Sequence, residues 1–210
     1  MRFTRVDLNA WERSEYFTHY LNDIPCTYSM TVRLDITRLK QSGQKLYPAM
    51  LYALAKAVNT HPEFRMSLDA DGKPGVYDRM HPSYTVFHKD TQTFSNLWTV
   101  FDEDYAVFCQ NYQQDMKTYG GIHRMDAKTG LPENSFTVSM LPWASFEGFH
   151  LNLQKGYTYL KPIFTIGKYT EENDRYALPL AVQVHHAVCD GFHACRLVDD
   201  VQATLDSGLF

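Results

Sequence analysis

Hydrophobic and polar residues follow two different spacings along the chain, and these predict strands and helices in turn. In residues 28–34, apolar side chains occupy every second position, which is the spacing of a half-buried strand. Residues 176–184 are apolar at nearly every position, as expected for a strand buried on both faces. In residues 192–205, apolar side chains recur every three or four positions, which predicts a helix.

The same spacings, together with capping and turn residues, predict the other elements. Helix starts are expected at Asn9, Asp35, Pro48 and Asp102. The remaining strands are expected at residues 65–70, 75–78, 83–88, 93–100, 135–141, 148–153 and 162–169. Strands interleaved with helices, several of them joined as hairpins, predict an α/β fold with a large mixed sheet covered by helices.

Length and composition favour a single domain over residues 1–210. A chain of 210 residues with 44% hydrophobic residues can bury a full core. The formal net charge of -4, without a basic cluster, argues against nucleic acid as a partner.

Three further features predict a cytoplasmic protein without a membrane partner. No apolar run approaches the roughly 18 residues of a membrane span. Residues 1–7 lack the apolar core of a signal peptide. The four cysteines are scattered, which fits reduced thiols better than a disulfide framework.

Two adjacent histidines, His185 and His186, stand where the apolar run 176–184 ends and an Asp190-Gly191 turn leads into the next predicted helix. Histidine can take and return a proton near neutral pH, because its ordinary pKa is about 6.5. Neighbouring residues of a strand point to opposite faces, so one histidine can face a reaction while the other packs.

Two other interpretations of the histidine pair are open at this point. Both rings could be core side chains with satisfied nitrogens. Alternatively, His185 or His186 could bind a metal together with Cys189 and Asp190. The sequence contains no HExxH or CxxC motif that would complete such a site, and no bound metal is predicted.

The wider string around the histidines carries a resemblance to a known family. Residues 183–193 read QVHHAVCDGFH and contain the pattern HHxxxDG. Other matching strings are Leu34-Asp35-Ile36-Thr37, Phe87-His88, Thr93-Phe94-Ser95, Ser139-Met140-Leu141-Pro142-Trp143 and Lys168-Tyr169. Over essentially its whole length, the sequence resembles the coenzyme A-dependent acyltransferases, and among them the type A trimeric chloramphenicol acetyltransferases.

This resemblance implies a fold and an activity. The implied fold is a two-layer sandwich, in which helices cover a large mixed sheet. The implied activity is the transfer of an acetyl group from acetyl-CoA to a hydroxyl of chloramphenicol, which gives antibiotic resistance. Acetyl-CoA would be a co-substrate, and no permanently bound cofactor is implied.

Acetyl transfer from a thioester to a hydroxyl needs a base for the hydroxyl proton and a donor for the oxyanion. By resemblance, His186 matches the general base of a direct mechanism in a ternary complex. Ser139 matches the oxyanion donor, and Thr165 matches a residue that helps to hold water and the oxyanion.

Four further residues are matched to structural support of the site. Asp190 is expected to form an ion pair with Arg13 of the first helix, and His185 is expected to pack. Gly191 is expected to be required by a positive φ, because a turn from a strand into a helix often needs one.

No GxGxxG or Walker loop appears, so individual charges and rings would have to bind coenzyme A. By resemblance, Lys45 and Lys168 lie near phosphate, and Tyr169 and Trp143 lie along the adenine and pantetheine path. Considered one at a time, these lysines are also what a solvated surface would show.

The acceptor pocket maps by resemblance onto apolar and aromatic residues, as a nitrophenyl ring would require. They are Tyr20, Ile24, Cys26, Tyr28, Phe94, Phe149 and Leu151. Composition alone would favour core positions for the same residues. Tyr28 stands where the family usually has phenylalanine, and the loop around Met125-Asp126 lacks the phenylalanine that relatives place over the antibiotic.

A single copy of the HHxxxDG pattern suggests an oligomer. Relatives with two such domains can form a channel between their halves, whereas this chain has one half, so a second subunit must supply the opposite wall. We expect a homotrimer with interfacial sites. Each site would take His186 from one chain, with Ser139 and Tyr20 contributed by its neighbour or shared.

Two alternative functions remain at the level of the sequence. One is a coenzyme A-dependent acyltransferase with a different hydroxyl or amine acceptor. The other is a metal-binding or non-catalytic module that uses His185, His186 and Asp190.

Overall fold

The computed structural model describes residues 1–153 and 158–210. Within these residues, a main sheet of seven strands has the order β2-β10-β8-β7-β5-β6, and β9 pairs with β10 beside this path. Its strands are β2 (Thr27–Asp35), β5 (His81–His88), β6 (Thr93–Trp98), β7 (Ser135–Met140), β8 (Ile163–Ile166), β9 (Thr170–Glu172) and β10 (Arg175–His185). Parallel and antiparallel pairs both occur, so the predicted mixed sheet is confirmed.

Strand β10 is the longest strand of this sheet and pairs along both of its edges. Its 11 residues pair antiparallel with β2 along one edge, and with β8 and then β9 along the other. Leu180, Val182 and Val184 are buried in the hydrophobic core. The residues between them, Ala181 and Gln183, therefore face the opposite side of the sheet.

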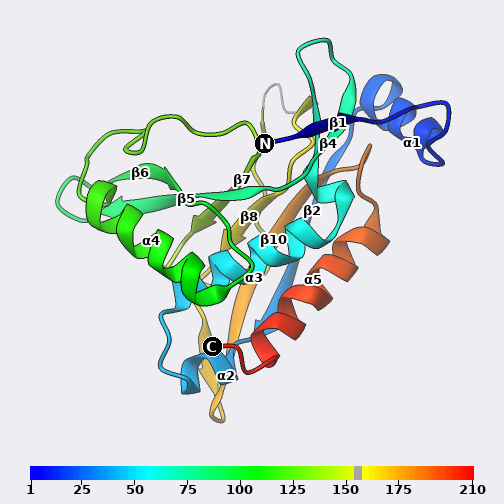
Figure 1. The fold of residues 1–210 in the computed structure, drawn as a ribbon. Helices are drawn as coiled ribbons and strands as arrows, with labels where there is room; N and C mark the ends of the chain where they lie inside the picture. Colours follow the sequence, from blue (N-terminus) through cyan, green and yellow to red (C-terminus); the bar gives the residue numbers. More distant parts are fainter. Residues whose placement is uncertain (154–157) are drawn as a thin grey trace.

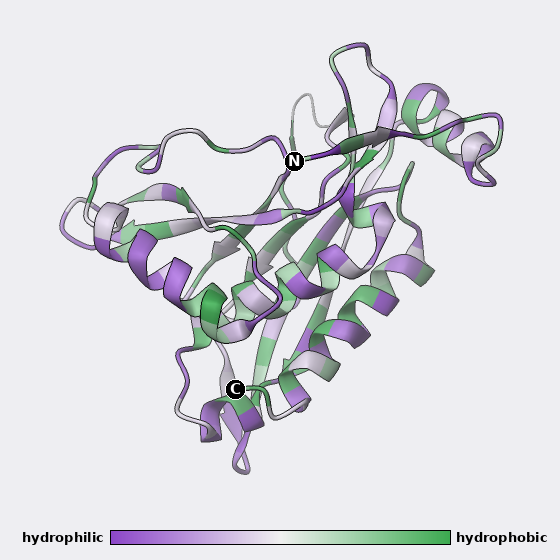
Figure 2. Cartoon of the chain, viewed as in Figure 1, coloured by the Kyte–Doolittle hydropathy of each residue, from purple (hydrophilic) through white to green (hydrophobic). Residues whose placement is uncertain are grey.

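Three long helices cover one face of the sheet: α3 (Leu46–Thr60), α4 (Tyr105–Tyr119) and α5 (Gly191–Asp206). Figure 1 shows α3 in cyan, α4 in green and α5 in red on the same side of the strands. In Figure 2, α4 and α5 alternate between hydrophobic and hydrophilic residues, as expected for helices with one buried face. This is the predicted arrangement of helices over a mixed sheet.

Smaller elements complete the fold. A second sheet has the order β1-β4-β3, and its β3–β4 hairpin turns at Gly72, whose φ is +72°. The predicted hairpin is therefore confirmed. The other elements are β1 (Phe3–Arg5), β3 (Met66–Leu68), β4 (Pro74–Tyr77), α1 (Ser14–Thr18), η1 (His19–Asp23), α2 (Thr37–Gln41) and η2 (Pro62–Arg65).

Three predicted helix starts are wrong. Helix α3 begins at Leu46, two residues before Pro48, so Pro48 lies in its first turn. The first helix begins at Ser14 and not at Asn9, because the Asp7 carboxylate accepts the backbone N–H of Asn9 at 3.0 Å and favours a turn there. Asp104, not Asp102, caps α4, since its carboxylate accepts the N–H groups of Ala106 and Val107. At the first helix and at α4, a nearby aspartate accepts backbone N–H groups and so sets where the helix begins.

The strand predicted at residues 148–153 is also wrong. No ladder forms there, and the segment 141–153 lies on the face of the sheet that the long helices leave uncovered. The ring of Phe146 lies against Gly167, the residue that follows β8, and a Cβ added there would also meet Pro179 of β10. Leu151 is held by a side chain of β10, described below, so its backbone needs no neighbouring strand.

The structure also bears on the membrane question. In the described residues, no helix has both the length and the apolar character required to cross a membrane.

The packing of Phe146 on Gly167 predicts a stability effect. A Cβ at Gly167 would lie 2.7 Å from Phe146 Cε1 and 2.7 Å from Pro179 Cγ, so Gly167→Ala should destabilise the protein by about 1 to 3 kcal/mol. Gly148→Ala is the matched control, because a Cβ there meets nothing within 4 Å. Urea denaturation at fixed protein concentration checks this, and equal midpoints for the two variants would contradict it.

Candidate active site

His186 stands immediately after the end of β10. Its backbone N–H donates to the carbonyl of Cys26 at 2.9 Å, which ties the ring to the start of β2. The imidazole stacks on Tyr20, with ring centroids 3.9 Å apart and planes 8° apart. Tyr28 meets the same ring edge-on at 5.4 Å. Two aromatic side chains thus fix the orientation of a half-buried imidazole.

The two nitrogens of His186 have different surroundings. Nδ1 is buried and has no hydrogen-bond partner among the described residues. The ring as a whole is only partly buried. If the neutral ring carries its proton on Nδ1, its Nε2 lone pair is available to accept a proton from a substrate.

His185 has a different environment. It is 1% exposed, and its Nδ1 accepts the N–H of Ala187 at 3.1 Å. Its carbonyl oxygen accepts the N–H groups of Val188 and Cys189. These bonds close the turn that follows β10. The buried side chain of His185 therefore packs within the fold and supports this turn.

Asp190 joins this turn to two other parts of the chain. It caps α5 by accepting the N–H groups of Phe192 and His193, and its Oδ2 lies 2.7 Å from Arg13 Nη1. Burial raises the pKa of Asp190, but the hydrogen bond from Arg13 and the charges on His193 and Arg13 hold it below its ordinary value. The carboxylate therefore stays charged and anchors the N-terminal segment beside the motif.

The role expected of Gly191 is wrong. It is the first residue of α5 and does not have a positive φ. A Cβ at this position would meet nothing within 4 Å. Asp190 itself makes the turn, in an extended conformation with φ -103° and ψ -178°, so the helix begins without a left-handed residue.

Cysteine and tyrosine side chains surround His186. Tyr28 Oη lies 4.0 Å from Cys189 Sγ. Burial raises the pKa of Tyr28 above its usual range, and burial raises the pKa of Cys189 to about 12. Both groups therefore stay neutral at physiological pH. Ile24, just before Cys26, is 58% exposed and lies at the rim.

Ser139 and Thr165 lie in a different part of the sheet. They are register partners in β7 and β8, and Thr165 is the partner of Ala181 in β10. Ala181 precedes His186 by five residues, which corresponds to about 16 Å along a strand. The chain therefore does not bring Ser139 or Thr165 to its own His186.

The remaining candidate acceptor residues are also spread out. Phe94 of β6 is the register partner of Phe87, whose ring lies 4.6 Å from that of Trp143. Phe94 and Trp143 are 49% and 60% exposed, respectively. Phe149 packs on Phe146 with centroids 5.5 Å apart. These ring contacts are made among β5, β6 and the segment 141–153.

Of the candidate coenzyme A residues, Lys168 and Tyr169 lie near the start of β10. The N–H of Lys168 donates to the Ala144 carbonyl at 2.8 Å, which joins it to the Trp143 turn. Tyr169 packs against Tyr176 at 5.8 Å. Lys45 is exposed and immediately precedes α3.

Sequence analysis missed Lys40. Its Nζ lies 4.6 Å above the Tyr169 ring and 3.2 Å from Tyr169 Oη. A lysine in a predicted surface helix carries no signal that separates it from any solvated charge. Its pairing with Tyr169, 129 residues away, is visible only in the fold.

The candidate residues thus form two groups at a distance from each other. The histidine half-site consists of His186, Tyr20, Cys26 and Tyr28. The serine half-site consists of Ser139, Thr165, Trp143, Lys168 and Tyr169. Thr170 pairs with Ala177, nine residues before His186, so Tyr169 lies about 30 Å from that histidine along the strand.

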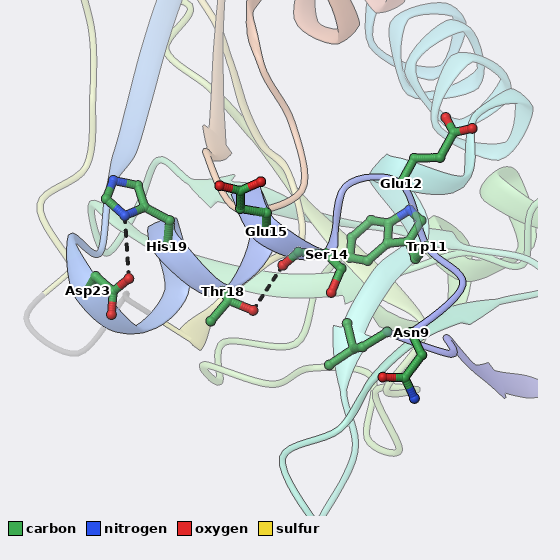
Figure 3. A pocket seen from close by; sticks show the side chains of 9 residues that line it. Asn9, Trp11, Glu12, Ser14, Glu15, Thr18, His19 and Asp23 are labelled. Carbon is green, nitrogen blue, oxygen red and sulfur yellow. Dashed lines mark hydrogen bonds and ion pairs between the residues drawn. The ribbon is translucent and has the colours of Figure 1, made fainter.

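A surface pocket lies beside α1 and η1. Figure 3 shows Glu12, Glu15, His19 and Asp23 around it, with an ion pair between His19 and Asp23. None of the candidate site residues lines this pocket. In residues 1–153 and 158–210, no three His, Cys, Asp or Glu side chains are grouped as metal ligands would be.

The Arg13–Asp190 ion pair predicts a coupling between two substitutions. Asp190→Asn keeps a capping side chain but removes the charge, and Arg13→Met removes the other partner. The double variant should lose less stability than the sum of the single losses, by on the order of 1 kcal/mol. Urea denaturation of the four proteins at fixed concentration measures this coupling.

The coupling should also depend on pH. The pKa of Asp190 is lowered from 3.8, so the stability that the ion pair contributes is present above pH 3.8 and is lost as the pH falls through the lower, folded-state pKa. Additive single losses at pH 7 would contradict the assignment of this ion pair.

Comparisons with known proteins agree with one another. The family model described as chloramphenicol acetyltransferase matches residues 1–202. A chloramphenicol acetyltransferase of Campylobacter coli is 58% identical, over 98% of this chain and 100% of its own length. One of Clostridium perfringens is 57% identical, over 99% of this chain and 100% of its own length.

A comparison with solved structures gives the same family. A solved chloramphenicol acetyltransferase superimposes with a TM-score of 0.82 at 24% identity, covering 97% of this chain and 100% of the other. The chain therefore belongs to the chloramphenicol acetyltransferase family.

Proposed function

We propose that the chain transfers an acetyl group from acetyl-CoA to a hydroxyl of chloramphenicol, and so confers resistance to this antibiotic. Family membership and relatives named for this reaction support the proposal. The observation that carries the chemistry is the half-buried imidazole of His186, held flat against Tyr20 with its Nδ1 enclosed. Such a ring has one nitrogen left for a substrate.

The proposed step is direct. His186 Nε2 takes the proton of the acceptor hydroxyl as its oxygen attacks the thioester carbonyl. The Ser139 hydroxyl donates to the oxyanion of the tetrahedral intermediate, and one such donor is worth on the order of 3 kcal/mol in the barrier. The intermediate then expels the coenzyme A thiolate, which takes the proton back from His186, so no acyl-enzyme forms.

The site is proposed to lie between subunits. His186 and Ser139 are separated by about 16 Å along the strands of one sheet, so they can meet only across a contact between two copies. That contact joins the histidine half-site of one copy to the serine half-site of the next. Such a head-to-tail contact closes into a ring, which we take to be a trimer.

This arrangement assigns sides to the ligands. Tyr20 belongs to the subunit that supplies His186, because the two rings stack within one chain. Coenzyme A would approach along the partner's serine half-site, where Lys45 and Lys168 can meet phosphate and Trp143 and Tyr169 offer rings. All four cysteines are free thiols, which suits the cytoplasm as the place of action.

The general base can be tested by thiol release from acetyl-CoA, with and without chloramphenicol. His186→Ala should lower chloramphenicol-dependent release by about 10²- to 10⁴-fold, because positioned proton transfer contributes this much. A chelator should leave the wild-type rate unchanged. Release that continues at the wild-type rate in the variant would falsify the assigned base, and release with other alcohols or amines alone would indicate a different acceptor.

The shared site can be tested by mixing two inactive variants. His186→Ala and Ser139→Ala are unfolded together and reassembled. In any mixed trimer, one interface of the ring joins an intact His186 to an intact Ser139. Mixed trimers should therefore recover about one third of the wild-type rate, whereas each variant reassembled alone stays at its own low rate. No recovery in isolated mixed trimers would contradict a site divided in this way.

A further inference from the structure

Gln183 makes a two-point contact with the segment that crosses the uncovered face of the sheet. Its side-chain Oε1 accepts the backbone N–H of Leu151 at 2.8 Å, and its Nε2 donates to the Leu151 carbonyl at 2.9 Å. The primary amide thus replaces the peptide of a neighbouring strand. We call this pair of bonds the Gln183 clasp.

The clasp involves a polar side chain that is buried beside the hydrophobic core. Gln183 is 8% exposed and lies between Val182 and Val184, both of which are buried in the core. A buried amide that lacks partners costs on the order of 1 to 3 kcal/mol, so both ends of this side chain have to be satisfied. Leu151 satisfies both of them.

The clasp connects the strand that leads to His186 with the segment that carries Phe149 and Leu151. Gln183 precedes His186 by three residues on the same backbone run. Leu151 and Phe149 belong to the segment 141–153, which is also held by the Phe146 ring beside Gly167 and by the hydrogen bond from Lys168 to Ala144. At Leu151, the distance of the segment from β10 is set by the Gln183 side chain.

We infer that Gln183 is a positioning residue for the acceptor. It holds the wall formed by Phe149 and Leu151 at a fixed height above β10 and takes no part in proton transfer. This inference rests on the proposed assignment of those two residues to the acceptor pocket. It assigns to Gln183 an effect on acceptor affinity, with little effect on acetyl-CoA affinity or on the chemical step.

The fold contains a matched control for this clasp. In α5, Gln202 makes the same pair of bonds to the backbone of Asp35: Oε1 accepts its N–H at 2.9 Å, and Nε2 donates to its carbonyl at 2.9 Å. Asp35 ends β2, at the edge of the sheet far along the strand from Thr27 and His186. Gln202→Met therefore removes an equivalent clasp about 20 Å along β10 from Gln183, because Asp35 pairs with Ala177.

The experiment compares Gln183→Met and Gln202→Met with the wild type, after light scattering has shown the same assembly for all three. KM for chloramphenicol, KM for acetyl-CoA and kcat are measured for each. Gln183→Met should raise the chloramphenicol KM about tenfold, with the other two constants within about twofold of the wild type. Gln202→Met should leave the chloramphenicol KM and kcat within about twofold.

Two results would overturn the inference. One is an unchanged chloramphenicol KM in Gln183→Met. The other is an equal rise in both variants, which would indicate general loosening. The wild-type rate with chloramphenicol reports on the proposed function itself, and the ratio between variants reports on the clasp, so the two can fail separately.

Gln183→Glu gives a second readout that does not depend on tolerance of Met. A neutral carboxylic acid has a donor and an acceptor in nearly the geometry of the amide, whereas the carboxylate has no donor for the Leu151 carbonyl. Burial at this position, where Gln183 is 8% exposed, should raise the pKa of the introduced carboxyl above its ordinary value of about 4.3, so the group should be largely neutral at pH 5. The equilibrium Kd for chloramphenicol should therefore be raised about tenfold at pH 8 and return toward the wild-type value at pH 5. A Kd ratio to wild type that stays the same at both pH values would reject the clasp.

Discussion

The length and rigidity of β10 control how this molecule can function. A strand of 11 residues, paired along both edges, cannot bend to bring its two ends together. The end that carries His186 and the end that meets Tyr169 therefore stay about 30 Å apart in every copy of the chain. If the reaction joins His186 to the serine half-site, as proposed, one copy of the chain cannot bring the two together within its own sheet.

The two faces of β10 carry different tasks. One face packs Leu180, Val182 and Val184 under the helices and contributes to the core. The other face carries Ala181 and Gln183, which lie under the segment 141–153. Because side chains alternate along a strand, the core can hold the backbone rigid without occupying the surface where substrates would meet. Beyond the last paired residue, Tyr20 and Tyr28 fix the ring of His186 from the side.

Many helices, strands and turns of this fold could be predicted from one sequence, because neighbouring residues specify them. The apolar run before His186, the Asp71-Gly72 turn and the spacing in residues 192–205 each specify an element through neighbouring residues. The HHxxxDG pattern singled out His186 and Asp190, and the fold shows Asp190 paired with Arg13 across 177 positions.

The errors arose where a side chain competed with the backbone. Residues 148–153 have a strand-like composition, but the Gln183 amide takes the hydrogen bonds that a ladder would use. Asp7 and Asp104 changed two helix starts in the same way. Gly191 seemed to require a positive φ, yet Asp190 absorbs the turn. The contact of Lys40 with Tyr169 and the separation of Ser139 from His186 depend on strand order, which one sequence does not display.

The attachment of the segment 141–153 has a consequence for how such enzymes diversify. A wall that was a member of the sheet could not change without altering the register of its neighbours. Here the segment is held to β8 and β10 at a few points, so insertions or exchanges between those points leave the pairing of β10 unchanged. Under the proposed assignment of Phe149 and Leu151 to the acceptor pocket, acceptor preference can therefore change in a lineage while His186 and its surroundings stay constant.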